Sequence, residues 1–378
     1  MPRPVLLVHP SAELYGSDRV FAESVRALAD SGREVLVALP ADGPLVPLLR
    51  SHGARVLRCP TPVLRKSALR PSGLLGLLRD CLSALPAMLR LLSRHRFEAV
   101  YVSTVTLPLW PPMARLFGRR VVAHVHEAED AVPRPIRVGI ALPLLCCHVV
   151  VANSAAAREV LLGAVPRLRE RVLVVRNGVH GPATPPEEPP ATSGSTGLVL
   201  VGRISPRKGT DTAVRAVALL RERGRAITLD LVGSVFAGYE WFERELEELV
   251  REHRLEEVVR SHGFDDDVWS HYAAADVVLV PSRMEPFGNT AVEAQLAMRP
   301  VVVTDAQGLP ETVDGGRRGS VVPADDPHSL ADRIEELLDD WEEARRRARH
   351  ARSEAARLFA PEHYRRSIRE LFETSKSR

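Results

Sequence analysis

Short apolar runs alternate with helix-patterned segments along the whole chain, and this alternation constrains the fold more than any other feature. Helical patterns lie between the apolar runs, among them residues 18–31, 72–95 and 154–162. Strands that alternate with helices form parallel sheets covered on both faces and joined by right-handed crossovers. The sequence therefore predicts an α/β protein. The runs that we expect to be buried strands are Val5–His9, Val35–Leu39, Ala99–Val102, Val121–Val125, Leu198–Val201, Ile227–Val232, Val277–Val280 and Val301–Thr304.

Residues 181–196 interrupt this alternation with five prolines among Gly, Ser and Thr, a composition typical of a linker. A chain of 378 residues is long enough for two domains at ~150 residues each. We expect a Rossmann-like domain over residues 1–180, a linker over 181–196 and a second Rossmann-like domain over 197–360. A cleft between the two domains is the simplest arrangement.

The net charge of +3 conceals an uneven distribution. Residues 1–180 hold 24 Lys and Arg against 13 Asp and Glu, whereas the remainder holds 27 against 35. A basic first half suggests an anionic partner, either a phosphorylated substrate or a membrane surface, with compositional drift as the alternative. The four cysteines include no Cys-x-x-Cys pair, and no secretory signal opens the chain, so we expect a reduced, cytoplasmic setting.

Two apolar stretches raise the question of a membrane span. Residues 72–95 are rich in leucine but contain Arg79, Asp80 and Arg90, which argue against a span. Val138–Ala152 is too short to span and is predicted to be a core helix that runs into a core strand. Because basic residues gather from Arg65 to Arg96, the first stretch is compatible with an anionic surface, and a packed helix with a solvated basic face is the alternative.

The segment Glu285–Glu293 carries the strongest chemical signal. It follows an expected strand and opens a helix that should stop before Pro300. Gly288 permits close backbone approach, Asn289 and Thr290 can cap, and the amides of a first helical turn bind phosphate. Two carboxylates eight positions apart accept hydrogen bonds from sugar hydroxyls, so the segment predicts a nucleotide-sugar site. An ordinary capped helix is the alternative.

Val201–Gly209 ends the first expected strand of the second domain, where ligands of such sheets bind. Arg203 and Lys208 can neutralise a diphosphate there. Only three lysines occur in the chain, so a lysine in this position is informative. The order Lys-Gly-Thr differs from a Walker phosphate loop, and no Gly-x-Gly-x-x-Gly follows either first strand, which weakens a dehydrogenase interpretation. A basic surface loop is the alternative.

Three further segments hold polar residues after expected strands. The His9–Asp18 loop offers Gly16 for backbone approach to a ligand and Asp18 as a helix cap. His124 and His126 share one face of a strand; zinc is rejected because no third ligand is apparent, and His124 is compatible with a satisfied core histidine. Asp265–Asp267 is interpreted as helix capping rather than as a metal site.

With these motifs located, nearly the whole chain resembles glycosyltransferase family 4, retaining enzymes of the GT-B fold. The opening of the chain, Glu13–Arg19, resembles a subgroup that builds surface polysaccharides. The motifs that carry the family resemblance are the Gly16 loop, His126-Glu127, Ala152-Asn153-Ser154, Asn177-Gly178-Val179, Gly202-Arg203, Lys208-Gly209, His262-Gly263-Phe264, Glu285–Glu293 and Gly308-Leu309-Pro310-Glu311.

The resemblance implies a role for each motif residue. The second domain holds the nucleotide diphosphate sugar, and the first holds the acceptor. The last helix, about 361–375 within residues 361–378, crosses back to the first domain, and no metal is required. The implied catalytic residues are His126 at the sugar, Arg203 and Lys208 at the diphosphate, and Glu285 at the sugar hydroxyls. The implied donor contacts also include Gly16 and Gly202. Gly263 and Phe264 would lie near the base, Glu293 at the ribose, and Phe287, Gly288, Asn289 and Thr290 at the diphosphate.

We therefore expect a retaining, metal-independent hexosyltransferase that moves a sugar from a nucleotide diphosphate sugar to a hydroxyl acceptor, a lipid-linked glycan or polysaccharide intermediate. An epimerase of the same fold, a transferase acting on a small-molecule natural product and a non-enzymatic nucleotide-sugar-binding partner remain alternatives. No cofactor or nucleic acid partner is expected. The cytoplasmic protein is expected to touch the inner face of the membrane at its periphery.

Overall fold

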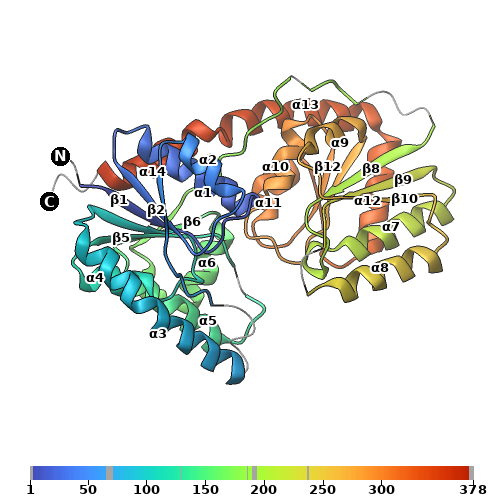
Figure 1. The fold of residues 1–378 in the computed structure, drawn as a ribbon. Coiled ribbons are helices and arrows are strands. Elements are labelled where there is room, and N and C mark those ends of the chain that lie inside the picture. The colour runs from blue at the N-terminus through green and yellow to red at the C-terminus, as the bar shows by residue number, and fades with distance from the viewer. Residues whose placement is uncertain are drawn as a thin grey trace. The chain divides into compact units, whose positions relative to one another are not determined.

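The chain divides into two compact units, Met1–Gly178 with Pro361–Arg378 and Val179–Ala360. The computed structural model describes residues 3–64, 71–128, 130–184, 186–189, 194–235 and 238–373. Each unit is built on a parallel sheet that helices cover on both faces (Figure 1). The expected α/β architecture with two Rossmann-like sheets is confirmed. The basic residues Arg65, Lys66 and Arg70 lie outside the described residues.

The sheet of the first unit runs in the order β3-β2-β1-β4-β5-β6-β7, and its strands are parallel. Its strands are β1 (Val5–Val8), β2 (Val35–Leu39), β3 (Arg55–Arg58), β4 (Ala99–Val102), β5 (Arg120–Val125), β6 (Val149–Ala152) and β7 (Val172–Val174). Its helices are α1 (Gly16–Ala29), α2 (Leu45–Ser51), α3 (Pro71–Arg94), α4 (Trp110–Leu116), α5 (Arg134–Ala141), α6 (Ala155–Ala164) and α14 (Pro361–Glu373).

Two cores cover the two faces of this sheet because successive side chains of a strand point to opposite sides. In β1, Leu6 and Val8 pack with α3, α4, α5 and α6. Val5 and Leu7 pack instead with α1, α2 and α14. The inner strands β1, β2 and β4 are buried on both faces, and this explains why they read as continuous apolar runs in the sequence.

The sheet of the second unit runs in the order β10-β9-β8-β11-β12-β13 and is also parallel. Its strands are β8 (Thr196–Val201), β9 (Ile227–Val232), β10 (Val259–Gly263), β11 (Val277–Val280), β12 (Val301–Thr304) and β13 (Ser320–Val322). Its helices are α7 (Thr210–Glu222), α8 (Glu240–Glu252), α9 (Val268–Ala274), α10 (Asn289–Leu296), α11 (Leu309–Thr312), α12 (Pro327–Asp339) and α13 (Trp341–Leu358).

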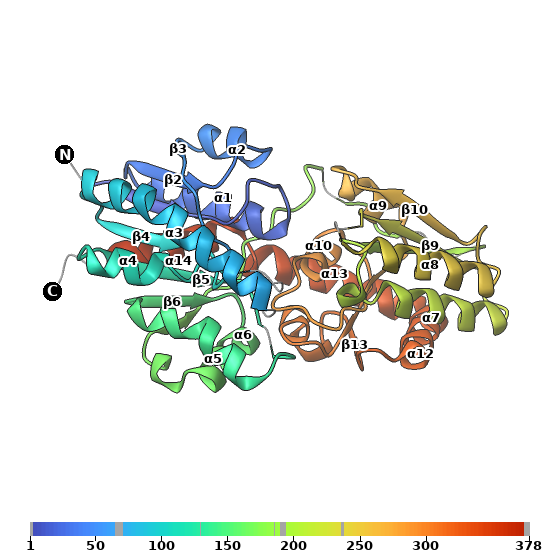
Figure 2. The ribbon, with the colours of Figure 1, turned by 60° about the horizontal axis from the view of Figure 1, so that its bottom comes forward.

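Helices again cover both faces of the second sheet. One core joins alternate strand residues such as Leu198 and Leu200 to α7, α8 and α12 (Figure 2). The opposite core joins Val199 and Val278 to α9, α10 and α11. A third cluster packs Val292 of α10 against Ala355 and Phe359 at the end of α13. Helix α10 is therefore held between the sheet and α13.

The prediction for Val138–Ala152 is only partly right. The segment contains the end of α5, a 3-10 turn over Leu142–Cys146 and the buried strand β6. The strand was expected, but α5 is not a core helix, because Ala141 is its only fully buried residue. Ile136, Val138 and Ile140 are half-buried, and Ile140 packs against the rim of the core that α3, α4 and α6 form with the sheet. No described helix combines the length and apolar character that crossing a bilayer requires.

The chain passes between the two units twice, once after Gly178 and once before Pro361. Both passages meet within the first unit, because a Cβ atom built on Gly178 would lie 2.7 Å from the Cα atom of Pro361. Helix α14 then completes the core that α1 and α2 form on the opposite face of the first sheet, with Tyr364, Ile368 and Phe372. Its Arg365 forms a buried ion pair with Glu23 of α1, with 2.6 Å between Nη1 and Oε2.

Gly209 joins the turn Pro206–Lys208 to α7 and offers a test of this packing. Its φ is +66°, and a Cβ atom there would lie 1.9 Å from the carbonyl oxygen of Pro281. Gly224, with φ of +83° and open space around it, is the matched control. Both alanine variants introduce backbone strain, but only Gly209→Ala adds a clash. We expect it to lower the free energy of unfolding by about 1–3 kcal/mol more than Gly224→Ala in urea denaturation. Equal losses would contradict this packing.

Candidate functional site

An ion pair between Lys208 and Glu285 lies at the carboxyl edge of the second sheet. Lys208 ends the loop that follows β8, and Glu285 belongs to the loop that follows β11. The two strands are neighbours in the sheet, so their loops emerge side by side. The Lys208 Nζ atom donates to Glu285 Oε2 over 2.5 Å, and both side chains are mostly buried. The two predicted residues therefore meet in one charged pair.

The environment of Glu285 keeps its carboxylate ionised. Burial is the largest influence on its pKa and raises it, but attraction to Lys208 and the Lys208 hydrogen bond lower it. The charge of Arg207 and a hydrogen bond from Ser282 add to this effect, and the resulting pKa lies below its usual range. An ionised carboxylate accepts hydrogen bonds only, and it is suited to hydroxyl donors.

Backbone contacts hold the loop between Glu285 and α10. Gly308, which follows β12, donates its N–H to the Glu285 carbonyl over 3.0 Å, and a Cβ atom on Gly308 would lie 2.2 Å from the carbonyl oxygen of Pro286. Phe287 is buried and packs edge-on against Phe359. The loop is thus pressed between neighbouring segments and has little room to move.

Helix α10 begins without a side-chain cap, which corrects the sequence prediction. Its N-cap residue is Gly288, with φ of +104°, and no side-chain cap hydrogen bond is present. Asn289 and Thr290 are therefore the first two helical residues rather than caps. The helix ends at Leu296, before Pro300 as predicted. An N-terminus that starts in this way directs first-turn amides away from the helix, an arrangement that suits an anion.

Glu293 lies one turn into α10 and is oriented by a buried tyrosine. The Tyr272 hydroxyl of α9 donates to Glu293 Oε2 over 2.9 Å, and Tyr272 has no exposed surface. The pKa of Tyr272 is raised well above its usual value by burial and by the Glu293 charge. The hydroxyl therefore remains a donor that fixes one oxygen of Glu293. The sequence analysis did not identify Tyr272, which lies 21 residues before its partner.

Arg283 joins the two charged loops, and it too was missed from the sequence. Its guanidinium donates two parallel hydrogen bonds of 2.8 Å to Asp211 at the start of α7, and a third to the Pro206 carbonyl over 2.6 Å. It also pairs with Asp325 over 2.5 Å. These bonds raise the pKa of Arg283, so its guanidinium, which clamps Asp211 and the Pro206 carbonyl, stays charged. The clamp fixes the Lys208 loop against the Glu285 loop.

The remaining predicted residues of the second unit lie along the same sheet edge. Gly202 directly follows β8 and lies beside the Lys208 side chain. Arg203 is exposed in the same loop. Gly263 ends β10, and Phe264 after it exposes 58% of its surface. A large exposed aromatic ring at a strand end offers a flat apolar contact to a planar ring.

The acidic run Asp265–Asp267 is engaged in local contacts. Asp267 caps α9, because its carboxylate accepts from the Ser270 N–H over 3.3 Å, as predicted. Asp265 instead pairs with His271 over 2.9 Å. Among the described residues, no group of three His, Cys, Asp or Glu side chains has the geometry of a metal site.

In the first unit, His126 follows β5 and is a neutral imidazole. Burial is the main cause that lowers its pKa to about 3, and the charge of His9 lowers it further while Asp18 opposes the shift. Its Nε2 atom is buried and has no hydrogen-bond partner. His126 therefore carries no positive charge near neutral pH, and among the described residues no group uses the hydrogen-bonding capacity of its Nε2 atom.

Two neighbours of His126 are turned inward. The His124 ring lies 4.0 Å from the His126 ring, and its Nδ1 shares a 2.5 Å hydrogen bond with the buried Tyr101 hydroxyl, as expected for a core histidine. Glu127 accepts hydrogen bonds from the Thr104 hydroxyl and the His126 N–H. Burial raises the pKa of Glu127 despite these bonds. Gly16, also predicted, is the first residue of α1.

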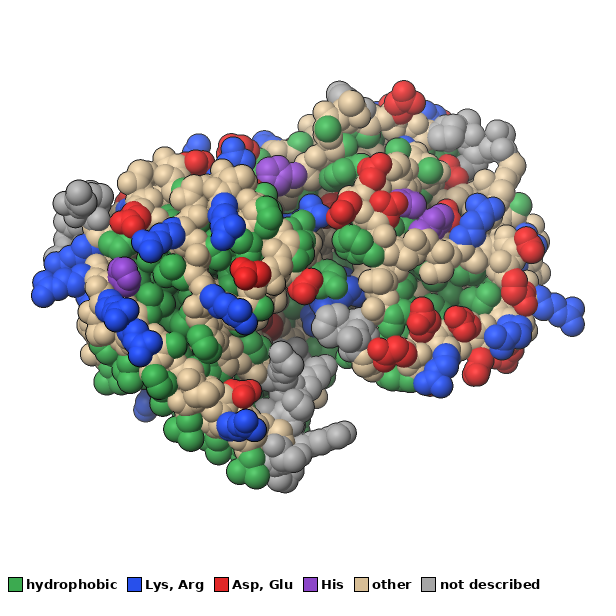
Figure 3. All heavy atoms as spheres, viewed as in Figure 1, with side chains coloured by type: hydrophobic (Ala, Val, Ile, Leu, Met, Phe, Trp, Pro, Cys, Tyr) green, Lys and Arg blue, Asp and Glu red, His purple; other side chains and the backbone are tan. Residues whose placement is uncertain are grey.

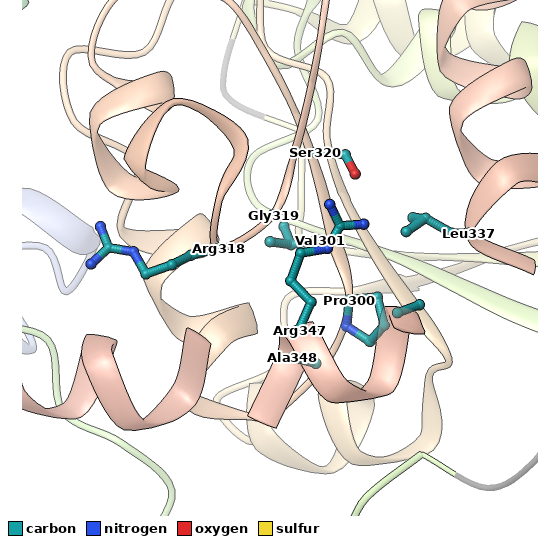
Figure 4. A pocket seen from close by; sticks show the side chains of 9 residues that line it. Pro300, Val301, Arg318, Gly319, Ser320, Leu337, Arg347 and Ala348 are labelled. Atoms are coloured by element: carbon teal, nitrogen blue, oxygen red, sulfur yellow. The ribbon is translucent and has the colours of Figure 1, made fainter. Parts of the chain in front are cut away.

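The small cavity of Figure 4 lies apart from this site. Its lining includes Val301 and Ser320, the first residues of β12 and β13, and hence the amino edge of the sheet. Lys208 and Glu285 lie at the carboxyl edge. The cavity measures about 10 Å³, no more than one water molecule needs.

Comparisons with known proteins cover both units. Residues 15–180 match the family model described as Glycosyltransferase Family 4, and residues 186–354 match Glycosyl transferases group 1. D-inositol 3-phosphate glycosyltransferase of Nocardia farcinica is 30% identical over 294 residues, which cover 74% of this chain and 65% of that protein. The chain thus spans less than two thirds of the length of this curated relative.

Solved structures share the fold. HepE of Anabaena, crystallised with UDP and glucose, has a TM-score of 0.81 and 23% identity over all of both chains. WaaG, described as a glycosyltransferase involved in lipopolysaccharide biosynthesis, has a TM-score of 0.71 and 18% identity over 96% of this chain and 99% of its own. These likenesses establish the two-sheet GT-B architecture.

Replacing Lys208 tests the charge balance at Glu285. In the wild-type protein the pKa of Glu285 is lowered, so ionisation stabilises the fold at neutral pH, and this contribution is lost as pH falls through the lowered pKa. In Lys208→Met we expect burial to dominate and to raise that pKa. The variant should lose about 1–3 kcal/mol of unfolding free energy at pH 7 and less at pH 4.

Urea denaturation across this pH range measures the effect. Arg333→Met is the matched control, because it removes a cation from an exposed pair with Glu336 in the same unit. Its small loss should be similar at both pH values. A Lys208→Met deficit that stays constant between pH 4 and pH 7 would show that the two charges are not coupled.

Proposed function

The chain belongs to the family 4 and group 1 glycosyltransferases, and on that premise we propose that it transfers a sugar from a nucleoside diphosphate sugar to a hydroxyl group with retention of anomeric configuration. HepE, whose fold it shares, was crystallised with UDP and glucose. The resemblance of the sequence motifs to retaining enzymes supports retention. The acceptor class that we propose is a lipid-linked glycan, in keeping with WaaG, a glycosyltransferase involved in lipopolysaccharide biosynthesis.

The observation that carries the proposal is the Lys208–Glu285 pair beside the uncapped start of α10. An ammonium group has three donors, so Lys208 can hold Glu285 and a phosphate oxygen at the same time. Glu285 then keeps its second oxygen for sugar hydroxyls. Arg203 and the first amides of α10 supply further positive ends for the diphosphate.

Catalysis on this proposal is electrostatic. As the bond between sugar and diphosphate breaks, negative charge grows on the leaving group and positive charge on the sugar ring. Fixed donors that face the diphosphate stabilise that charge without reorganisation. His126, as a neutral imidazole, orients a hydroxyl rather than balancing charge. The lysine, arginine and amides take the part that a divalent metal takes in other transferases, so we propose metal independence.

A donor panel tests the proposed function. We expect one nucleoside diphosphate sugar to release nucleoside diphosphate when a lipid-linked acceptor is added, at the same rate in excess EDTA. The product should keep the anomeric configuration of the donor by NMR. Conversion of the donor sugar without acceptor would indicate an epimerase, and binding without turnover would indicate a carrier protein. Recovery of activity with Mn²⁺ would indicate a metal-dependent enzyme. Each of these results contradicts the proposal.

Variants locate the chemistry in the same assay. Lys208→Ala and Arg203→Ala should each lower kcat about 10²–10³-fold with smaller changes in donor affinity, because diphosphate charge grows toward the transition state. Arg333→Ala is the control, since Arg333 pairs with Glu336 at the surface of α12. Loss of affinity with intact turnover would count against both roles.

We further propose that the first unit meets an anionic membrane through α3. Five leucines of this helix are 41–69% exposed, whereas Ala84, Met88 and Leu92 enter the core. At about 100° per residue, the exposed leucines fall within one arc of about 100°, and Arg79 and Arg90 lie about 40–60° beyond it. Figure 3 shows hydrophobic side chains alternating with Lys and Arg over the first unit. The five leucines are Leu74, Leu75, Leu78, Leu82 and Leu89.

This pattern is that of a helix lying in a membrane interface, with leucines toward the acyl chains and arginines toward phosphates. A lipid-linked acceptor is met at that surface. Leu75→Ser with Leu82→Ser should reduce flotation with anionic vesicles several-fold, and salt should weaken wild-type binding. Trp241→Ser, which removes an exposed apolar side chain from α8, is the control and should bind normally. Equal binding to neutral vesicles, or by the leucine variant, would overturn the proposal.

A further inference from the structure

Three buried polar side chains form a chain of hydrogen bonds beneath the Gly16 loop of the first unit. His9 follows β1, Ser103 follows β4, and Asp18 lies in the first turn of α1. His9 Nε2 lies 2.6 Å from Asp18 Oδ1, and His9 Nδ1 lies 2.5 Å from the Ser103 hydroxyl. Each of the three is at most 2% exposed. Nothing in the sequence motifs indicated this connection.

Asp18 holds the loop at both of its ends. Its Oδ1 also accepts from the Ser11 hydroxyl over 2.9 Å, and its Oδ2 accepts from the Tyr15 N–H over 2.8 Å. Asp18 is thus the third residue of α1 and accepts from the N-cap backbone N–H, whereas the sequence analysis expected it to cap a helix that starts at about residue 18. One carboxylate therefore fixes the start and the end of the loop that leads to Gly16.

His9 is the anchor that ties this carboxylate to the sheet. The His9 ring stacks on Phe21 with 4.3 Å between centroids, and the backbone N–H of His9 donates to the Ala38 carbonyl of β2 over 3.3 Å. The Ser103 N–H donates to the Val8 carbonyl over 3.0 Å. The loop position is therefore set by two neighbouring strand ends rather than by solvent-exposed contacts.

The order of atoms excludes a hydrolase triad. In such a triad the serine bonds Nε2 of the histidine and the acid bonds Nδ1. Here the serine bonds Nδ1 and the acid bonds Nε2. Ser103 is also 1% exposed and cannot reach a substrate. The set is not nucleophilic machinery.

We propose that His9 and Asp18 are positioning residues that hold the Gly16 loop in the conformation that meets the donor, with Ser103 fixing the orientation of the His9 ring. This rests on the proposed function, in which Gly16 contacts the donor. A buried charge on Asp18 needs hydrogen-bond donors around it. The imidazole N–H of His9 supplies one such donor, so the first backbone amides of α1 can keep their positions. A similar bond fixes the ring orientation of histidines in other sites.

Two isosteric substitutions of His9 separate its two bonds. In His9→Gln the side-chain amide nitrogen occupies the place of Nε2 and can still donate to Asp18. In His9→Asn the nitrogen occupies the place of Nδ1, so the bond to Asp18 is lost. We expect His9→Asn and Asp18→Asn to lower kcat/KM about 10²-fold. His9→Gln should stay within a few-fold of the wild type.

Ser24→Ala is the matched control for general destabilisation. Ser24 is buried on the same helix, and its hydroxyl bonds Tyr364 over 2.5 Å, away from the loop. It should lower the melting temperature as much as Asp18→Asn does but leave kcat/KM within twofold. The proposal is overturned if Ser24→Ala loses equal activity, if Asp18→Asn keeps activity while folded, or if His9→Gln fails like His9→Asn.

Hydrogen exchange separates this proposal from the proposed function. In the wild type the Tyr15 amide is bonded to Asp18 and should exchange slowly. Asp18→Asn and His9→Asn should accelerate exchange over residues 10–17 while the rest of α1 stays protected. This readout requires no donor. A chain that turns over no nucleotide sugar but shows the exchange pattern contradicts only the function, whereas unchanged exchange contradicts the positioning role.

Discussion

Parallel pairing makes every strand of a sheet end at the same edge, and the candidate site depends on this constraint. In the second unit, loops that follow β8, β11 and β12 contribute Lys208, Glu285 and Gly308, three residues that together span 100 positions of the chain. The strand order also reverses between β8 and β11, where open α/β sheets bind ligands.

Ion pairs between side chains and hydrogen bonds to backbone carbonyls hold these loops in place. Arg283 clamps Asp211 and the Pro206 carbonyl, and Lys208 is held by Glu285. A site built in this way has its dipoles fixed before a ligand arrives, and such preorganisation makes electrostatic stabilisation effective. The same principle operates in the first unit, where Asp18 bonds His9 at the start of the Gly16 loop and the Tyr15 N–H near its end.

Local patterns in the sequence predicted the central strands well, because these strands are buried on both faces and read as apolar runs. Ile227–Val232 and Val277–Val280 match β9 and β11 to the residue. Edge strands such as Arg55–Arg58 and Val259–Gly263 were missed, since one side or more meets solvent and polar residues interrupt the pattern. The resemblance is confirmed by the two family matches.

In the candidate site, too, the sequence predicted some residues and missed others. Lys208 and Glu285 stand in recognisable motifs, and the structure brings them together. Tyr272, Arg283 and the bond between His9 and Asp18 arise from tertiary contacts that no local spacing encodes. The expected cap at Asn289 was wrong because Gly288, in a left-handed conformation, already turns the chain into the helix.

Helix α14 has a consequence for synthesis of the chain. It supplies Tyr364, Ile368, Leu371 and Phe372 to a core whose other members lie before Val179. During translation the ribosome must complete all of the second unit before this helix emerges. Until then α1 and α2 cover only part of that face of the first sheet, and the nascent chain exposes an apolar surface that chaperones bind. The second unit is in effect an insertion into the first, and the time needed to synthesise it sets the shortest time for which that surface stays exposed.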